Sequence, residues 1–182
     1  ISADSHFSEP ADLWINYIDP EFRARAPHVE HQEHADVFVC DTGEMLPIGI
    51  LHGIRYKGGV AKNEGRYSEV PASSWDPHAR IPELNLDGVY GEVLYPTIAM
   101  RFYTITDVPF EAACIRAYNR WASDFCKSYP DRFKAVGLVM LDDLGQGVDQ
   151  LRECKELGLA AAMLPVYPDG AAPYYESSYD SL

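Results

Sequence analysis

The sequence of 182 residues lacks the features of several common classes of protein. It has no apolar run of about 18 residues, which argues against a transmembrane helix. No basic region followed by an apolar core stands at its start, so no signal peptide is predicted; because the first residue is Ile1, we expect upstream residues to be missing or removed. Positive charge is scarce, since 15 Lys and Arg accompany 28 Asp and Glu and the net charge is −13. This acidic balance disfavours nucleic acid and membranes as partners. With no signal peptide or transmembrane helix predicted, we expect a cytoplasmic protein.

Cysteine is also scarce, and its spacing lacks the common thiol motifs. The four cysteines are Cys40, Cys114, Cys126 and Cys154, and no two of them form a C-x-x-C pair. We interpret them as buried free thiols in a reducing compartment.

What the sequence does contain is an alternation of apolar strands and amphipathic helices. Strands are predicted near residues 1–4, 89–95, 134–141 and 160–166, and helices near 109–129 and 145–157. An earlier helix is expected to run from Ser8, as its N-cap, through Pro10 in the first turn to Ile18. Such alternation is typical of parallel β/α units in an α/β protein.

Four such strands make half of a (β/α)8 TIM barrel, which typically needs about 250 residues. An open doubly wound sheet is the alternative, but the glycine fingerprint of a dinucleotide site is missing after the first strand. An insertion is predicted at about 35–75, with a β-hairpin near 35–50 and a long irregular loop over 52–80. We therefore expect residues 1–182 to form a single domain, the first half of a barrel with an inserted hairpin.

Asp4 and His6 end the first predicted strand two residues apart, so their side chains point to one face. A carboxylate and an imidazole directed at one point are a metal-ligand pair when that face lines a cavity. The pair predicts one divalent ion, Zn²⁺ or Mn²⁺, and the carboxylate favours Mn²⁺ somewhat. The alternative is that Asp4 caps a turn and His6 is an ordinary polar residue.

Four further residues are candidates for the same site. Glu9 is predicted to bind the metal or to support its ligands, although a carboxylate at a helix N-terminus also interacts favourably with the helix dipole. Arg80 and Arg101 are candidates to hold a substrate carboxylate through two hydrogen bonds. Trp75, in the predicted loop, is a candidate to line or close a pocket.

Three histidines, His28, His31 and His34, could be read as a second metal cluster. Their spacing of three residues suits neither one face of a strand nor the pair of ligands four apart on a helix. We predict a solvated surface segment instead.

Three segments together resemble the amidohydrolase-related family that includes aminocarboxymuconate semialdehyde decarboxylase and γ-resorcylate decarboxylase. They are SADSHFSEPADLW, WDPHARIPELNLDGVYGEVLYPT, and AYNRWASDFCKSYPDRFKAVGLVMLDD continuing to LGLAAAMLPVYPDG. The resemblance implies a distorted (β/α)8 barrel with one divalent metal at its C-terminal mouth, and Asp4 and His6 match the first-strand ligand pair. A later histidine, a final aspartate and the catalytic base are implied as well, all expected beyond Leu182.

The resemblance predicts an enzyme, a metal-dependent hydrolase or carboxy-lyase of the amidohydrolase superfamily. Its small-molecule substrate would be a cyclic or aromatic carboxylate or a lactone. The alternative is a non-catalytic half-barrel, a fragment or one chain of a split protein. Because a half-barrel leaves strand edges open, we expect a homo-oligomer or pairing with the missing half.

Overall fold

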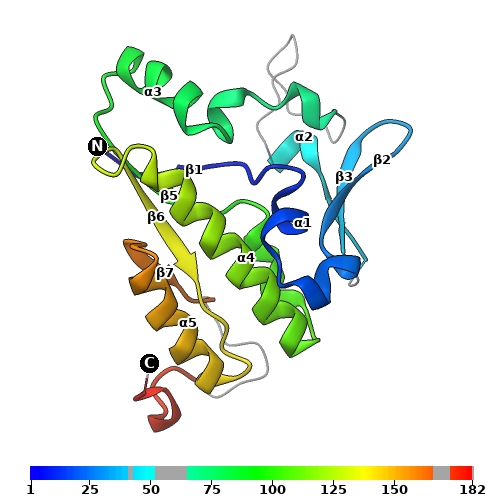
Figure 1. Cartoon of the computed structure of the whole chain (residues 1–182), viewed down its shortest axis with the longest axis vertical. Helices are drawn as coiled ribbons and strands as arrows, with labels where there is room; N and C mark the ends of the chain where they lie inside the picture. Colours follow the sequence, from blue (N-terminus) through cyan, green and yellow to red (C-terminus); the bar gives the residue numbers. More distant parts are fainter. Residues whose placement is uncertain (41–42, 52–64, 166–172, 182) are drawn as a thin grey trace.

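The computed structural model describes residues 1–40, 43–51, 65–165 and 173–181, and its centre is a parallel sheet (Figure 1). The strands of this sheet are β1 (Ser2–His6), β5 (Glu92–Tyr95), β6 (Phe133–Leu138) and β7 (Ala161–Met163). All neighbours are parallel and the spatial order is β1-β5-β6-β7, which is also the chain order. A doubly wound sheet reverses its strand order at a switch point, whereas a β/α barrel proceeds in one direction. The sheet therefore has the topology of part of a barrel.

Two long helices cover one side of this sheet. They are α4 (Val108–Lys127), which packs on β6, and α5 (Leu144–Glu156), which contacts β6 and β7. Asp107 begins α4 by accepting a hydrogen bond from the backbone N–H of Phe110, and Asp143 begins α5 in the same way with Gln146. Gly158, at φ +78°, follows α5 in the left-handed conformation that favours glycine. The predicted strands and both predicted helices are confirmed, with boundaries shifted by a few residues.

The contact between α4, α5 and β6 is close and specific. A Cβ atom on Gly137 of β6 would lie 2.6 Å from Cys154 Sγ and 2.8 Å from Leu159 Cδ1, so a larger residue would force these side chains to move. The buried Asn119 of α4 donates from Nδ2 to the carbonyl of Leu138 at 2.9 Å and accepts its N–H at Oδ1 at 2.8 Å. A side-chain amide thus pairs with the end of β6 as a neighbouring strand would.

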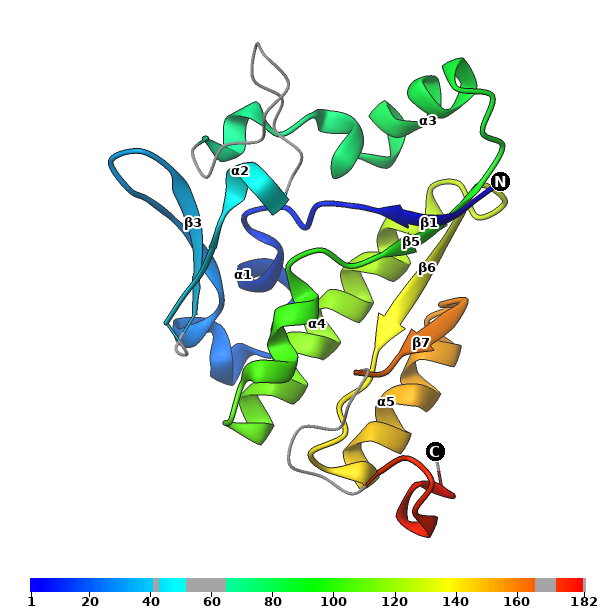
Figure 2. The same ribbon diagram turned by 180° about the vertical axis from the view of Figure 1, so that it is seen from behind.

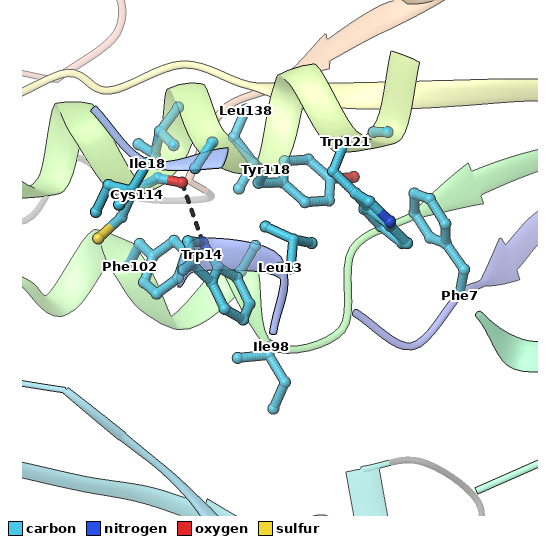
Figure 3. Close-up of a cluster of buried hydrophobic side chains, with 14 of the residues drawn as sticks. Phe7, Leu13, Trp14, Ile18, Ile98, Phe102, Cys114, Tyr118, Trp121 and Leu138 are labelled. Carbon is cyan, nitrogen blue, oxygen red and sulfur yellow. Dashed lines mark hydrogen bonds between the residues drawn. The ribbon is translucent and has the colours of Figure 1, made fainter. Parts of the chain in front are cut away.

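Aromatic side chains anchor the segment that follows β1 (Figure 3). Phe7 stacks on Trp121 of α4 with ring centroids 4.7 Å apart. Trp14 lies edge-on against Phe102, with ring centroids 5.0 Å apart, and its indole Nε1 donates to the carbonyl of Cys114. Each of these rings is at most 6% exposed, so the residues after β1 are fixed by burial on both sides of Glu9.

The helix that carries Trp14 is shorter than predicted. α1 spans Leu13–Tyr17 with Asp12 at the N-cap, and Ser8 is not a cap. The backbone N–H of Ser8 instead donates to the carbonyl of Ser74 at 2.8 Å. Residues 8–10 therefore lie outside the helix, and the distant loop that binds Ser8 is not revealed by the local sequence.

A second, antiparallel sheet lies beside the first and begins before the predicted insertion (Figures 1 and 2). Its strands are β2 (His28–His31), β3 (Asp36–Cys40) and β4 (Gly43–Pro47), followed by α2 (Ile48–Leu51). The predicted hairpin is confirmed for β3 and β4, but its second arm ends in a helical turn, and its turn residues 41–42 lie outside the described part of the chain. The solvated surface segment predicted around the histidines is confirmed for the exposed His31 and His34, and residues 28–31 in addition form an edge strand. A strand with the single apolar residue Val29 carries no alternating pattern to detect.

The long loop predicted over 52–80 is only partly tested, because 52–64 lie outside the described residues. Its end is wrong, since α3 (Pro77–Leu86) begins inside it. Asp76 caps α3 by accepting from the N–H of His78 at 2.8 Å, and Pro77 occupies the first helical turn. Asp-Pro is an ordinary helix-start signal, but the glycines earlier in the segment led to the prediction of one continuous loop. Short 3₁₀ turns cover Pro20–Arg25, Tyr67–Glu69, Ala72–Ser74, Ala99–Thr104 and Ser177–Tyr179.

Candidate functional site

The candidate site lies where the parallel strands end. In barrels of this kind the loops after the strands build the active site at the C-terminal edge of the sheet. His6 is the last residue of β1 and is in register with Tyr95, the last residue of β5. The loops after β1 and β5 therefore start side by side at this edge.

Asp4 and His6 do come together in the structure. The distance from His6 Nε2 to Asp4 Oδ1 is 3.9 Å, and the side chains are 47% and 87% exposed. The other ring nitrogen, Nδ1, lies 2.8 Å from the carbonyl oxygen of Pro96. Because a carbonyl only accepts, Nδ1 carries a proton in this hydrogen bond, and Nε2 is the ring nitrogen on the side of Asp4.

This arrangement fits a metal ion. Two donors bound to one ion at about 2.0–2.2 Å each are separated by at most about 4.4 Å, and 3.9 Å lies within that limit. Histidines that bind metals commonly donate their other N–H to a backbone carbonyl, as His6 does to Pro96. Within the described residues, no group of three or more His, Cys, Asp or Glu side chains is assembled for a metal, so this chain offers two ligands here.

Glu9 is fully buried, and its carboxylate is occupied by the backbone. It accepts hydrogen bonds from the N–H groups of Thr97, Ile98 and Ala99, each at 3.0 Å. Burial raises the pKa of Glu9, and the backbone hydrogen bonds oppose that rise. The side chain thus ties the loop after β1 to the loop after β5, and backbone N–H groups occupy three of its roughly four acceptor positions.

Arg80 is likewise engaged within the protein. Its guanidinium forms a two-point ion pair with Glu92 at the start of β5, with N···O distances of 2.6 and 3.1 Å. It also donates to the carbonyl of Ser73 at 3.1 Å and to the carbonyl of His6 at 3.0 Å. The structure therefore shows Arg80 bound to a carboxylate of the protein itself and to the backbone at the end of β1.

Arg101 and Trp75 remain exposed near the loops of the site. Arg101 lies in the 3₁₀ turn that follows β5, and its side chain faces solvent. Trp75 is 37% exposed and adjoins Ser74, whose carbonyl accepts the N–H of Ser8 in the loop after β1. Both residues stay candidates for contact with a substrate.

The other histidines are dispersed rather than clustered. His28 faces Glu30 at 3.5 Å, His31 bonds to Asp36 at 2.7 Å, and the exposed His34 lies near a glutamate. Each has its own acidic neighbour on the small sheet or in the connection between β2 and β3, away from the ends of the parallel strands.

Sequence reasoning missed Glu111, in the first turn of α4. Its side chain is fully buried, and neither carboxylate oxygen meets the geometry of a hydrogen bond with any described residue. Burial, together with the neighbouring Asp142 carboxylate, raises the pKa of Glu111 to about 8. In the sequence this residue looks like an ordinary acid at a helix start, so no local signal marks it.

An open cavity of about 420 Å³ lies beyond the ends of β6 and β7. It is lined by Val139, Leu151, Ala162, Leu164, Tyr174 and Tyr179. None of these is a residue that the sequence analysis singled out, and the cavity is mainly apolar. It is separate from the Asp4 and His6 pair.

Comparison with known proteins places the fold in one class. No protein-family profile matches the chain, and no curated protein resembles it. Among solved structures, an amidohydrolase from Mycobacterium avium subsp. paratuberculosis K-10 matches with a TM-score of 0.65 and 18% identity over 87% of this chain. The chain covers 46% of that protein. The fold is thus that of part of an amidohydrolase-type barrel, which confirms the predicted fold class and the resemblance at the level of fold.

Two decarboxylases have the same fold. A 5-carboxyvanillate decarboxylase from Novosphingobium aromaticivorans with bound manganese matches with a TM-score of 0.58 and 17% identity, over 99% of this chain and 45% of that one. A 2,6-dihydroxybenzoate decarboxylase from Rhizobium matches with a TM-score of 0.53 and 18% identity, over 98% and 43%. This chain therefore spans less than half the length of each. No helix within the described residues is long and apolar enough to cross a membrane.

Proposed function

We propose that this chain supplies the first-strand ligands of a metal-dependent enzyme that removes carbon dioxide from a small hydroxylated aromatic carboxylate. The observation that carries the proposal is the pair formed by Asp4 and His6, with His6 Nδ1 held on Pro96 and Nε2 3.9 Å from Asp4 Oδ1. Support for the substrate class comes from the decarboxylases of the same fold, two of which hold manganese.

Each residue of the site has a part in this function. Asp4 and His6 would hold the divalent ion, Mn²⁺ or Zn²⁺, which when bound polarises substrate oxygens or lowers the pKa of a water. Arg101 would attract the anionic substrate to the mouth, because its side chain is exposed on the loop after β5. Trp75 would cover the ring of the substrate. The remaining ligands and the general base would come from outside the described residues.

Hydrolysis of a cyclic substrate such as a lactone is the second candidate function. The observation that favours it is the likeness to a solved amidohydrolase, whose TM-score of 0.65 exceeds those of the decarboxylases. The two candidates share the metal pair and differ in whether a water attacks the substrate.

The first test is metal binding by the chain itself. Titration with Mn²⁺, followed by the loss of the electron paramagnetic resonance signal of the free ion, should show weak binding to one site, because two ligands leave an ion mostly hydrated. His6→Ala should abolish this binding. His34→Ala is the matched control, since His34 is an exposed histidine in the connection between β2 and β3, and it should bind as the wild type does.

The second test addresses the reaction. The protein extended to full barrel length, or the chain combined with a second half, is incubated with Mn²⁺ and a panel of hydroxybenzoates and aromatic lactones. Release of carbon dioxide supports the decarboxylase, and ring opening without gas release supports the hydrolase. For the first test, binding of Mn²⁺ by His6→Ala as tight as that of the wild type would reject Asp4 and His6 as the metal site.

A further inference from the structure

Glu9 connects two loops that are far apart in the sequence. Its three backbone partners are 88 to 90 residues away, and they directly follow Pro96, whose carbonyl accepts the Nδ1–H of His6. Two more hydrogen bonds join the same loops, from Thr97 Oγ1 to the carbonyl of Phe7 at 2.8 Å and from the N–H of Phe7 to the carbonyl of Tyr95 at 3.3 Å. The loops after β1 and β5 are therefore bonded together over their first few residues.

The choice of a distant carboxylate needs an explanation. The N–H groups that open a short helical turn are usually capped by the side chain of the N-cap residue, but the N-cap here is Ile98, which has no such group. A buried carboxylate is also a costly substitute, because its charge loses its hydration. Unlike a local cap, Glu9 links the loop after β1 to the segment that follows Pro96, whose carbonyl binds the ring of His6.

We propose that Glu9 is a positioning residue, which fixes residues 96–99 so that the carbonyl of Pro96 keeps His6 in the tautomer and orientation that turn Nε2 toward Asp4. The inference rests on the proposed metal role of His6 for its functional meaning, but the positioning itself concerns only protein atoms. In the absence of the link, the ring of His6, which is about half exposed, would be free to rotate and to protonate at either nitrogen.

The test compares Glu9→Gln with the wild-type chain by nuclear magnetic resonance. A glutamine has the same shape, yet it offers one acceptor oxygen and places an NH₂ group against backbone N–H donors. In metal-free protein with ¹⁵N-labelled histidine, we expect the wild-type ring of His6 to be a single tautomer with the proton on Nδ1. In Glu9→Gln we expect a mixture of both tautomers. Near-ultraviolet circular dichroism shows whether the variant keeps its fold.

Asp143→Asn is the matched control. It makes the same acid-to-amide change at a residue that caps a helix, α5, through the N–H of Gln146 and has no bond to His6. This variant should leave the tautomer of His6 unchanged. Where the wild-type chain binds Mn²⁺, Glu9→Gln should weaken that binding by about 10- to 100-fold, the usual effect of losing a group that orients a ligand.

Each outcome decides something. A folded Glu9→Gln in which His6 keeps one tautomer overturns the inference. So does a wild-type His6 protonated on Nε2, and this measurement needs no variant, which keeps the inference testable if Glu9→Gln does not fold. Failure of the wild type to bind Mn²⁺ counts against the proposed function, while the tautomer still reports on positioning.

Discussion

Arg80 and Glu92 form a two-point ion pair in the interior, with only 12% and 5% of their side chains exposed. The pair joins α3 to the first residue of β5, and through the carbonyl of His6 it also reaches the end of β1. A substrate-binding arginine would have to give up this partner. The ion pair therefore stabilises the fold and fixes the backbone that carries His6.

Loss of one member of this pair should be costly. Arg80→Ala leaves the Glu92 carboxylate buried without a counter-charge, and we expect the free energy of unfolding to fall by about 3–5 kcal/mol. Urea denaturation measures the change. The control is Arg152→Ala, which breaks a pair with Asp149 that is 70% and 76% exposed and should cost less than about 1 kcal/mol. Equal effects of the two variants would contradict this account.

Glu111 should make stability depend on pH. Its pKa is raised from 4.5 to about 8, so between these values the folded chain keeps a proton that the unfolded chain releases. The folded state then binds more protons, and stability falls as pH rises from about 5 to 8 and levels off above that range. Glu111→Gln should be more stable than the wild type at pH 8 and show a smaller slope in urea denaturation across this range.

The exposed Glu83 of α3 provides the comparison for that experiment. Glu83→Gln removes the same charge from a solvated position and should leave the slope between pH 5 and 8 as in the wild type. A slope that persists in Glu111→Gln would show that another group is responsible.

A side chain at Gly137 is predicted to destabilise the fold. Its added Cβ would meet Cys154 Sγ at 2.6 Å and Leu159 Cδ1 at 2.8 Å in a buried layer, so Gly137→Ala should destabilise the fold by about 1–3 kcal/mol. Gly145→Ala is the control, because its Cβ would meet only Asp143 Oδ1 at 3.2 Å at the exposed start of α5. Thermal unfolding that ranks the two variants in the opposite order would refute the packing argument.

The open edges of the main sheet lead to a prediction about association. β1 and β7 are its outer strands, and among the described residues nothing pairs with their outer edges. Such edges bind other strands readily. We expect residues 1–182 expressed alone to form soluble oligomers through these edges and to release no carbon dioxide from hydroxybenzoates. Sedimentation velocity measures this, and a stable monomer with a tightly bound metal would contradict it.

The main sheet and its helices could be read from the sequence because their signals are local. The apolar run of β6 and the periodic apolar residues of α4 depend only on neighbours along the chain. Asp4 and His6 were found for the same reason, since residues two apart in a strand share a face. Edge strand β2 carried too few apolar residues to show a period.

The supports of the site could not be read in this way. Glu9 bonds to residues about 90 positions away, and Arg80 pairs with Glu92 across a strand start, so their partners depend on the tertiary fold. An arginine after a polar loop looks the same whether it meets a substrate or a buried glutamate. Residue type predicted that these side chains matter, and only the structure shows that they bind the protein itself.

Asn119 fixes the position of α4 along β6. Its amide bonds to both backbone groups of Leu138, so a shift of α4 by one residue, about 1.5 Å along its axis, would break both bonds at once. The helix therefore cannot slide gradually along β6, because any shift breaks both hydrogen bonds together. The loop from Val139 to Asp143 therefore starts at a defined level above the sheet, and a loop that begins at a defined level can present its side chains to a substrate with little variation.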